Sequence, residues 1–148
     1  MRISVKGRYA LASMITIAEN YRKEQYESIV NISGKLGISK IYLEQVFTLL
    51  KKAKLVRSVK GAQGGYILTR SPDKITAYDI LSATELSLFE PTEGTVTDAA
   101  PEIEASMKNL VFYKLDKTLA EKLKSVTLDD LLLEAKRNKK GQELMFYI

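Results

Sequence analysis

The side chains of this sequence that could do chemistry are mostly basic, and they are densest between residues 51 and 60. That stretch holds five basic residues and no acidic one: Lys51, Lys52, Lys54, Arg57 and Lys60. Cysteine and histidine are both absent from the 148 residues, which removes thiolate chemistry, disulfides and the usual imidazole ligands of metals. The chemistry that remains is charge pairing, and a concentrated run of positive charge suits a polyanion such as nucleic acid.

Positive charge is also distributed unevenly along the chain. Residues 1–70 hold 13 Lys and Arg against 4 Asp and Glu, whereas residues 71–148 hold 10 against 14, within a formal net charge of +5. A basic front half and an acidic rear half predict a nucleic-acid-binding part followed by a part with another task. The length suffices for one domain with a core, or for a small domain plus an oligomerisation element.

The basic run follows a helix-turn-helix pattern. A first helix is predicted to begin after Ser28 and to end at Gly37, because glycine readily adopts the left-handed conformation of a helix end. Ser39 would then cap a second helix that continues to about Lys52, since its hydroxyl can accept from an unpaired backbone N–H. One side of this helix is apolar at spacings of three and four: Leu43, Val46, Phe47 and Leu50. The opposite side could meet phosphates, base edges and thymine methyls in a major groove: Lys40, Ile41, Glu44, Thr48 and Lys51.

A glycine-tipped hairpin is predicted directly after this helix. One strand runs from Leu55 to Lys60, and a second strand-like stretch runs from Tyr66 to Thr69. Between them lie Gly61, Gly64 and Gly65, which we expect to supply positive φ angles and to leave the tip without bulk. The backbone could then lie against a sugar-phosphate strand or in a narrow minor groove. Because a helix-turn-helix pattern precedes it, we interpret this basic hairpin as a wing more readily than as a solvated turn.

The other segments predict a mainly α-helical fold with one small β-hairpin. The segment from Tyr9 to Ala18 is apolar almost all round and predicts a buried helix. That apolar run is broken by Ser13 and Thr16 and is too short to span a bilayer, so we expect a cytoplasmic protein with no membrane contact. Residues 76–81 predict a short capped helix, and residues 86–100 predict a loop.

The longest predicted helix runs from Pro101 to about Lys124. Its apolar residues recur every four positions and present more apolar surface than the small N-terminal part of the chain can cover. We therefore expect a homodimer, although the stripe could instead pack only on the N-terminal part of its own chain. The expected contact residues are Met107, Leu110, Val111, Leu115 and Leu119.

The chain accordingly divides into four predicted parts. Residues 1–85 are a winged helix-turn-helix DNA-binding domain, and residues 86–100 are a loop. Residues 101–135 are the dimerisation helix and a following short helix. Residues 136–148 are a basic spacer and an apolar tail.

Four motifs in register carry a resemblance to a known family: Met1 to Ala10, Ile38-Ser39, Tyr42-Leu43-Glu44-Gln45, and Val59-Lys60-Gly61 with Gly64-Gly65-Tyr66. They resemble the bacterial winged-helix transcriptional repressors of the IscR/CymR type, most nearly those of cysteine metabolism. The likeness covers nearly the whole chain and is stronger over residues 1–85. It implies that the helix after Ser39 enters the major groove, that Glu44 contributes to base selection and that Lys60 approaches the minor groove. The family often has arginine at positions 51 and 60, and lysine lacks the planar fork, which favours phosphate contacts there.

The residues expected to contact double-stranded DNA come from the first helix, the recognition helix and the wing. The three at the start of the first helix could contact phosphate, or they could instead solvate the entry to a buried helix. The full set is Arg2, Lys6, Arg8, Ser39, Lys40, Ile41, Tyr42, Glu44, Gln45, Thr48, Lys51, Arg57, Ser58, Lys60, Gly61 and Gly64.

No cofactor and no metal site are expected. Members of the family that bind an iron–sulfur cluster keep their cysteine ligands in the region of residues 86–100, where this chain has none. The loop carboxylates of Glu90, Glu93 and Asp98 fit no calcium-loop spacing and are interpreted as solvated.

The end of the chain is apolar: Met145, Phe146, Tyr147 and Ile148. Exposed termini are usually polar, so this tail either folds back on the dimer helix or binds a partner. The resemblance implies the partner, because the cysteine-metabolism repressors act with cysteine synthase. The active site of that enzyme accepts a C-terminal isoleucine carboxylate as a mimic of its substrate.

The predicted function is a dimeric, sequence-specific transcriptional repressor that binds an inverted repeat, with cysteine and sulfur metabolism genes as its expected targets. The alternative is a nonspecific or RNA-binding winged module without a sensing role. That module would need exposed stacking aromatics, which the predicted groove face lacks apart from Tyr42. An enzyme is disfavoured, because the chain has no His, no Cys, no phosphate-binding glycine loop and no carboxylate pair at a catalytic spacing.

Overall fold

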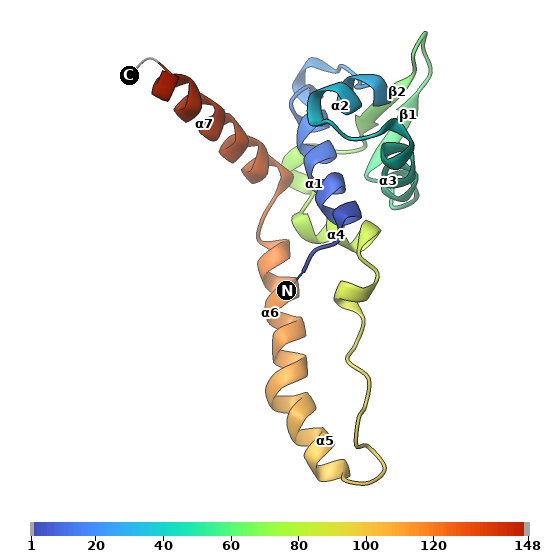
Figure 1. Ribbon diagram of the computed structural model, residues 1–148, viewed down its shortest axis with the longest axis vertical. Coiled ribbons are helices and arrows are strands. Elements are labelled where there is room, and N and C mark those ends of the chain that lie inside the picture. Colours follow the sequence, from blue (N-terminus) through green and yellow to red (C-terminus); the bar gives the residue numbers. More distant parts are fainter. Residues whose placement is uncertain (1, 147–148) are drawn as a thin grey trace.

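The first helix forms the centre of the head of this molecule, which is seen here in a computed structural model describing residues 2–146. This helix, α1 (Val5–Ala18), is surrounded by α2 (Ile29–Leu36), α3 (Lys40–Lys52), the strands β1 (Val56–Val59) and β2 (Gly65–Leu68), and α4 (Ala77–Thr84) (Figure 1). The head is therefore a winged helix-turn-helix, and the predicted fold class is confirmed.

The helix-turn-helix begins and ends where its local chemistry predicts. The hydroxyl of Ser28 accepts from the backbone N–H of Asn31 at 3.1 Å and caps α2. Gly37 ends that helix with a φ of 67°, a left-handed conformation that glycine adopts without steric cost. Ser39 then caps α3 by accepting from Tyr42 N–H at 3.3 Å. These hydrogen bonds are local, so the turn angle between the helices is encoded within this stretch.

The two wing strands are antiparallel, with Val56 opposite Leu68 and Val59 opposite Gly65. Our expectation that all three tip glycines have positive φ is wrong, because among them Gly64 alone does, at 65°. Gly65 has a different reason to lack a side chain. A Cβ there would lie 2.5 Å from Tyr26 Cδ2 and 2.7 Å from the carbonyl oxygen of Glu27.

This close approach adds a third short segment to the wing. Glu27 N–H donates to the carbonyl of Tyr66 at 3.0 Å, and Tyr66 N–H donates back to Glu27 at 2.8 Å. The segment before α2 is thereby paired with the second wing strand. The sequence pattern did not reveal this pairing, because residue 27 lies far from the hairpin along the chain.

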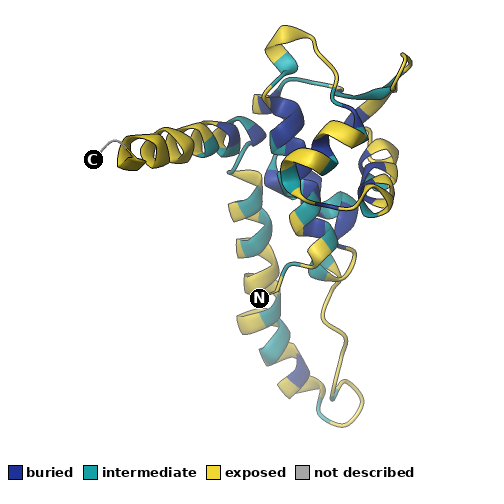
Figure 2. Ribbon diagram, turned by 45° about the horizontal axis from the view of Figure 1, so that its top comes forward, coloured by how far each residue is buried: buried dark blue, intermediate teal, exposed yellow. Residues whose placement is uncertain are grey.

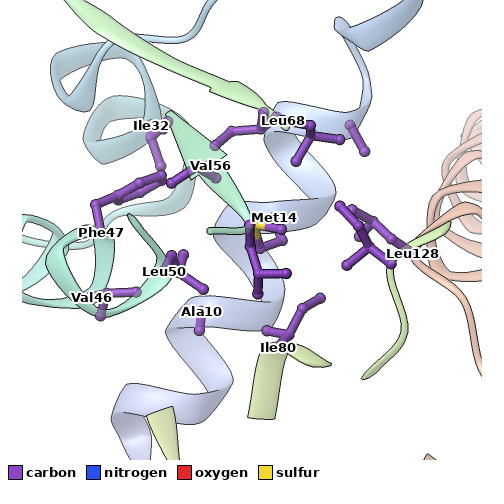
Figure 3. Close-up of a cluster of buried hydrophobic side chains, with 14 of the residues drawn as sticks. Ala10, Met14, Ile32, Val46, Phe47, Leu50, Val56, Leu68, Ile80 and Leu128 are labelled. Carbon is purple, nitrogen blue, oxygen red and sulfur yellow. The ribbon is translucent and has the colours of Figure 1, made fainter. Parts of the chain in front are cut away.

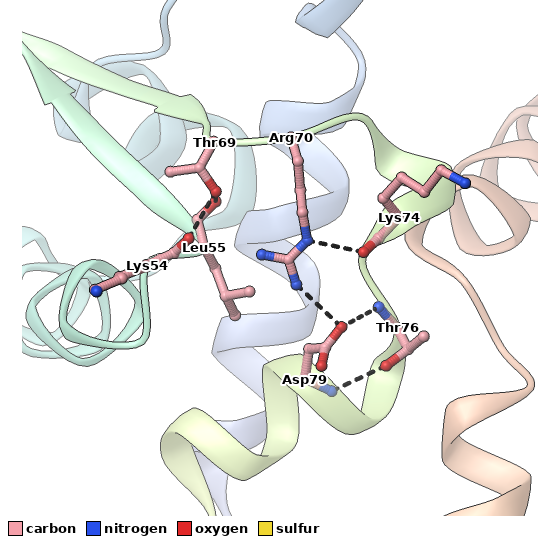
Figure 4. Close-up of polar contacts among 7 residues, drawn as sticks. All are labelled: Lys54, Leu55, Thr69, Arg70, Lys74, Thr76 and Asp79. Atoms are coloured by element: carbon pink, nitrogen blue, oxygen red, sulfur yellow. Dashed lines mark hydrogen bonds and ion pairs between the residues drawn. The ribbon is translucent and has the colours of Figure 1, made fainter.

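The base of the wing is fixed by polar contacts (Figure 4). Thr69 Oγ1 donates to the carbonyl of Lys54 at 2.6 Å, which joins the end of β2 to the end of α3. Arg70 donates from Nε to the carbonyl of Lys74 at 2.8 Å and from Nη2 to the carboxylate of Asp79 at 3.3 Å. The wing is therefore tied to α3 on one side and to α4 on the other.

The core lies between α1 and the elements that surround it (Figure 3). Met14, Phe47 and Ile80 are fully buried in it, and the hairpin contributes Val56 and Leu68. Leu128, from the start of the last helix, is also fully buried in this cluster. The rear part of the chain is thus anchored in the head and is not a separate body.

The predicted long helix is present from Pro101 to Lys124. It is made of α5 (Pro101–Met107), a π-helical segment (Lys108–Phe112) and α6 (Tyr113–Lys124), which follow one another as one rod (Figure 1). The π segment was not predicted. Most of the rod is exposed or half-exposed (Figure 2), in contrast to the buried centre of the head.

The last helix is longer than expected. We predicted that the basic run at residues 136–140 would end it, but α7 (Leu128–Phe146) continues through that run. Lysine, arginine, glutamine and leucine all favour helices, so a solvated charge run need not break one. Beyond its buried start α7 extends away from the head (Figure 2). No helix within residues 2–146 has the length and apolar character needed to cross a membrane.

Candidate nucleic-acid interface

The recognition helix α3 has one buried and one exposed face. Leu43, Val46, Phe47 and Leu50 are fully buried, as the periodicity predicts. The exposed face carries Lys40, Ile41, Glu44, Gln45, Thr48 and Lys51. The side chain of Ile41 is 73% exposed, although it is aliphatic and β-branched. An apolar group held in water beside charged ones suits a surface that will meet thymine methyls.

Three of the expected contact residues on α3 are already engaged within the protein. The Tyr42 ring is half-buried and packs edge-on against Tyr9 of α1, with ring centroids 5.0 Å apart. Ser39 serves as the helix cap, and Thr48 Oγ1 donates to the carbonyl of Glu44 at 2.8 Å. Tyr42 therefore braces the recognition helix against α1. The carboxylate of Glu44 stays exposed and able to accept from a base edge.

A groove separates the recognition helix from the wing. Its volume is about 390 Å³ and its lining includes Lys40 and Glu44 from α3, and Ser58 and Gly64 from the wing. Residues from both elements therefore face one space. This arrangement allows α3 to contact a base edge while the wing contacts an adjacent DNA strand. Ile29, Val30 and Gln63 also line the groove. They were not expected to contact DNA, because they carry no charge and lie outside the recognition helix and the glycines of the wing.

The two basic residues of the hairpin occupy different places. Lys60 is exposed near the tip, next to Gly61, whose Cβ would lie 3.2 Å from the hydroxyl of Tyr26. Arg57 instead lines a second hollow of about 700 Å³ with Tyr21 and Arg22, on the flank formed by Ile67, Leu68 and Thr69. Successive strand residues point to opposite faces, so Arg57 and Ser58 cannot share the groove beside α3.

The first turns of α1 lie beside the other end of the recognition helix. Lys6 lines a cavity of about 410 Å³ together with Leu49 and Lys52 of α3. Arg8 is exposed on the same turns, and Arg2 is exposed just before them. Positive side chains therefore stand at both ends of α3, with Lys60 of the wing beyond its start and Lys6 beside its end.

A buried carboxylate organises the loop that precedes the long helix. Glu104 of α5 accepts from the backbone N–H of Thr95 at 3.0 Å and of Val96 at 2.8 Å. These two donors, chiefly Val96, hold the pKa of the Glu104 carboxyl below its usual range. Glu90, Glu93 and Asp98 are exposed. No group of three or more metal-ligating side chains is found within residues 2–146.

The apolar stripe of the long helix is partly uncovered. Leu110 is 66% exposed and Leu115 is 63% exposed, and Val111 is also exposed. Met107 and Leu119 are half-buried. The head of the same chain therefore does not cover the middle of this helix, and the exposed residues coincide with the π-helical segment and the turn after it.

The described part of the tail is also uncovered. Met145 and Phe146 end α7, and the Phe146 side chain is 91% exposed. They do not fold back on the head or on the long helix. Tyr147 and Ile148, which we also expected to bind a partner, lie outside the described residues.

A helix-turn-helix whose exposed second helix stands beside a basic hairpin defines a winged helix-turn-helix DNA-binding protein. A family model named Rrf2, described as an iron-dependent transcriptional regulator, matches residues 3–134. The chain therefore belongs to the Rrf2 family and is a DNA-binding transcriptional regulator, not an enzyme.

Individual relatives agree with this assignment. The chain is 36% identical to the transcriptional regulator CymR of Bacillus subtilis over 148 residues, the whole of both chains. It is 33% identical to the regulator IscR of Pectobacterium carotovorum over 132 residues, which cover 89% of this chain and 79% of that one. The resemblance identified from the four motifs is confirmed.

Solved structures show the same fold. The structure of CymR, the global cysteine regulator of B. subtilis, superposes with a TM-score of 0.73 at 35% identity and covers 90% of this chain and 98% of that one. IscR of T. potens superposes with a TM-score of 0.68 at 37% identity, covering 91% and 88%.

Proposed function

We propose that this regulator acts as a homodimer that binds an imperfect inverted repeat in duplex DNA and represses transcription. The observation that carries the proposal is the groove in which Lys40 and Glu44 of α3 face Ser58 and Gly64 of the wing. An exposed helix face can enter the major groove while the wing reaches the adjacent strand. The alternative of a nonspecific or RNA-binding module gains little support, because Tyr42 packs on Tyr9 and is not free to stack on bases.

Dimerisation is proposed through the long helix. Leu110, Val111 and Leu115 are exposed on it, and an uncovered apolar stripe of this kind favours a partner copy. Each chain has one reading head, so a two-fold dimer presents two heads in opposite orientation. The matching DNA is an inverted repeat whose half-sites lie about one helical turn apart, or a multiple of it.

The test is a genome-wide footprint with the purified full-length protein, followed by fluorescence anisotropy on the recovered duplexes. We expect inverted half-sites and an affinity that falls steeply with salt, with a slope set by about six to ten phosphate contacts per dimer. Single-stranded DNA and RNA of the same sequence are the competitors. A monomer in sedimentation, binding indifferent to salt, or equal competition by the single strand would each contradict the proposal.

We propose cysteine and sulfur metabolism genes as the targets. The support is similarity over the whole chain to CymR, whose structure is described as that of a global cysteine regulator. The same footprint tests this, since the bound promoters should lie upstream of genes for sulfur uptake and cysteine synthesis. Sites confined to iron–sulfur cluster assembly genes would contradict it.

We further propose that the apolar tail binds cysteine synthase and thereby senses cysteine status. Met145 and Phe146 are exposed at the end of a helix that extends away from the head, where an enzyme could approach them. A terminal carboxylate can be held by backbone N–H groups at a helix N-terminus of the partner, and the tail aromatics can fill a cleft mouth.

The test uses a chain lacking Ile148, mixed with purified cysteine synthase. Deletion should abolish the complex without changing the melting temperature or the dimer, and O-acetylserine should displace the intact tail. The control is Gly141→Ala in α7, where an added Cβ meets no described atom within 4 Å, and it should keep the complex. A deletion that lowers the melting temperature by several degrees yet keeps the complex would show that the tail belongs to the core.

A further inference from the structure

The carboxylate of Glu85 is buried at the beginning of the first helix. Its side chain is only 6% exposed, and Oε1 accepts from the backbone N–H of Ser4 at 2.6 Å. None of the ion pairs within residues 2–146 includes Glu85. A buried charge without a cationic partner needs other compensation. The N–H of Ser4, the N-cap of α1, supplies one donor, and the start of α1 supplies the positive end of the helix dipole.

The helix leaves room for this carboxylate because residue 7 is glycine. A Cβ on Gly7 would overlap Glu85 Oε1 and lie 3.0 Å from both Glu85 Cγ and Ile3 Cγ2. Ser4 takes part on the other side, since its hydroxyl accepts from Gly7 N–H at 3.1 Å. Ser4, Gly7 and Glu85 form one interlocking contact, which we name the N-terminal latch.

The latch joins two regions with different tasks. Glu85 is the C-cap residue that follows α4, and it directly precedes the 86–100 segment that leads to the long helix. Ser4 is the N-cap of α1, and Gly7 lies in the first turn with Lys6 and Arg8, while Arg2 lies just before the helix. Tyr9, one residue after Arg8, packs on Tyr42 of the recognition helix. The position of the start of α1 therefore determines where three positive side chains stand relative to α3.

We propose that Glu85 is a positioning residue for DNA binding, which holds the start of α1 so that Arg2, Lys6 and Arg8 reach phosphates beside the major groove. The inference rests on the proposed duplex binding. Glu85 itself touches no DNA and acts only through the backbone of Ser4. The proposal takes the phosphate-contacting role of these three residues, one of the two that the sequence leaves open, over mere solvation of the entry to a buried helix.

The test compares salt slopes of duplex binding in the full-length protein. Glu85→Ala removes the acceptor and should lower the slope by about 2 to 5, the value for two to six lost phosphate contacts per dimer. Glu85→Gln keeps the shape and an acceptor oxygen and should retain the wild-type slope. Gly7→Ala displaces the carboxylate sterically while keeping its charge, and should behave like Glu85→Ala. Base-pair preference should be unchanged in all three, because α3 keeps its exposed face.

A triple variant, Arg2→Ala, Lys6→Ala and Arg8→Ala, provides the reference. It should show the same lowered slope, and adding Glu85→Ala to it should lower the slope no further. A purely structural role would reduce thermal stability and leave the slope unchanged. If the wild type shows no salt-dependent duplex binding, the proposed function fails. If the wild type binds but either the triple variant or Glu85→Ala keeps its slope, the positioning role is overturned.

Discussion

Gly65→Ala tests whether glycine is needed in the wing for the close approach of another segment, as distinct from a positive φ angle. The added Cβ would meet Tyr26 Cδ2 at 2.5 Å and the Glu27 carbonyl oxygen at 2.7 Å. The first contact is with a ring that could turn aside, but the second is with backbone. We expect the segment before α2 to be pushed away from β2, because a backbone carbonyl cannot rotate out of the way alone.

The magnitude follows from the hydrogen bonds that would be lost. Two backbone bonds, of 3.0 and 2.8 Å, join Glu27 and Tyr66. Each contributes about 0.5–1.5 kcal/mol net, so the free energy of unfolding should fall by about 1–3 kcal/mol. For a chain of this size about 1 kcal/mol corresponds to about 2–4 °C, so the melting temperature should fall by about 2–12 °C.

The assay is thermal unfolding followed by far-ultraviolet circular dichroism. The matched control is Gly34→Ala, in the middle of α2, where an added Cβ meets no described atom within 4 Å. Alanine there should stabilise by about 0.5–1 kcal/mol, because glycine is a poor helix former. If Gly65→Ala melts at or above the temperature of Gly34→Ala, the close approach is not a constraint and the reasoning fails.

Three further predictions concern the recognition helix, the loop and the dimer. Glu44→Ala should relax preference at one base pair by about 1–3 kcal/mol, whereas Lys60→Ala should lower the affinity for all duplexes alike. Competition with base-substituted duplexes checks both results, and the reverse pattern would show that the two roles are exchanged. Because backbone donors lower the pKa of Glu104, its stabilisation of the loop should be complete above the usual glutamate pKa of about 4.3 and be lost as pH falls through the lowered folded value. Hydrogen exchange of the loop amides should show this loss in the wild type and not in Glu104→Gln. Leu110→Asp should yield monomers in sedimentation with an unchanged melting temperature of the head, since this side chain is exposed in the single chain; a dimer that persists would place the interface elsewhere.

Much of the reading head was predictable because its determinants are local. The caps at Ser28 and Ser39 and the left-handed Gly37 are set by hydrogen bonds and dihedral preferences within a few residues. The buried and exposed faces of α3 follow from a period of 3.6 residues, which the sequence displays directly. The predicted strands of the hairpin were correct to within one residue at all four ends, because alternation and glycine mark strand limits.

Contacts between distant segments were decided only by the tertiary structure. Three glycines near the wing tip look alike in the sequence, yet Gly64 has a positive φ and Gly65 is needed for the approach of Glu27. Arg57 and Lys60 belong to one basic run, but strand pairing sends Arg57 to the flank with Arg22.

The chain by itself thus determined a winged helix-turn-helix head, the exposed face of its recognition helix and a long apolar-striped helix, because helix periodicity, caps and turns depend on neighbouring residues. Only the folded chain decided that Glu85 meets Ser4 across 81 positions of sequence, and that Leu128 completes the head core. Such pairings depend on how whole elements pack. No local pattern of residues encodes which carboxylate a distant helix N-terminus will bind.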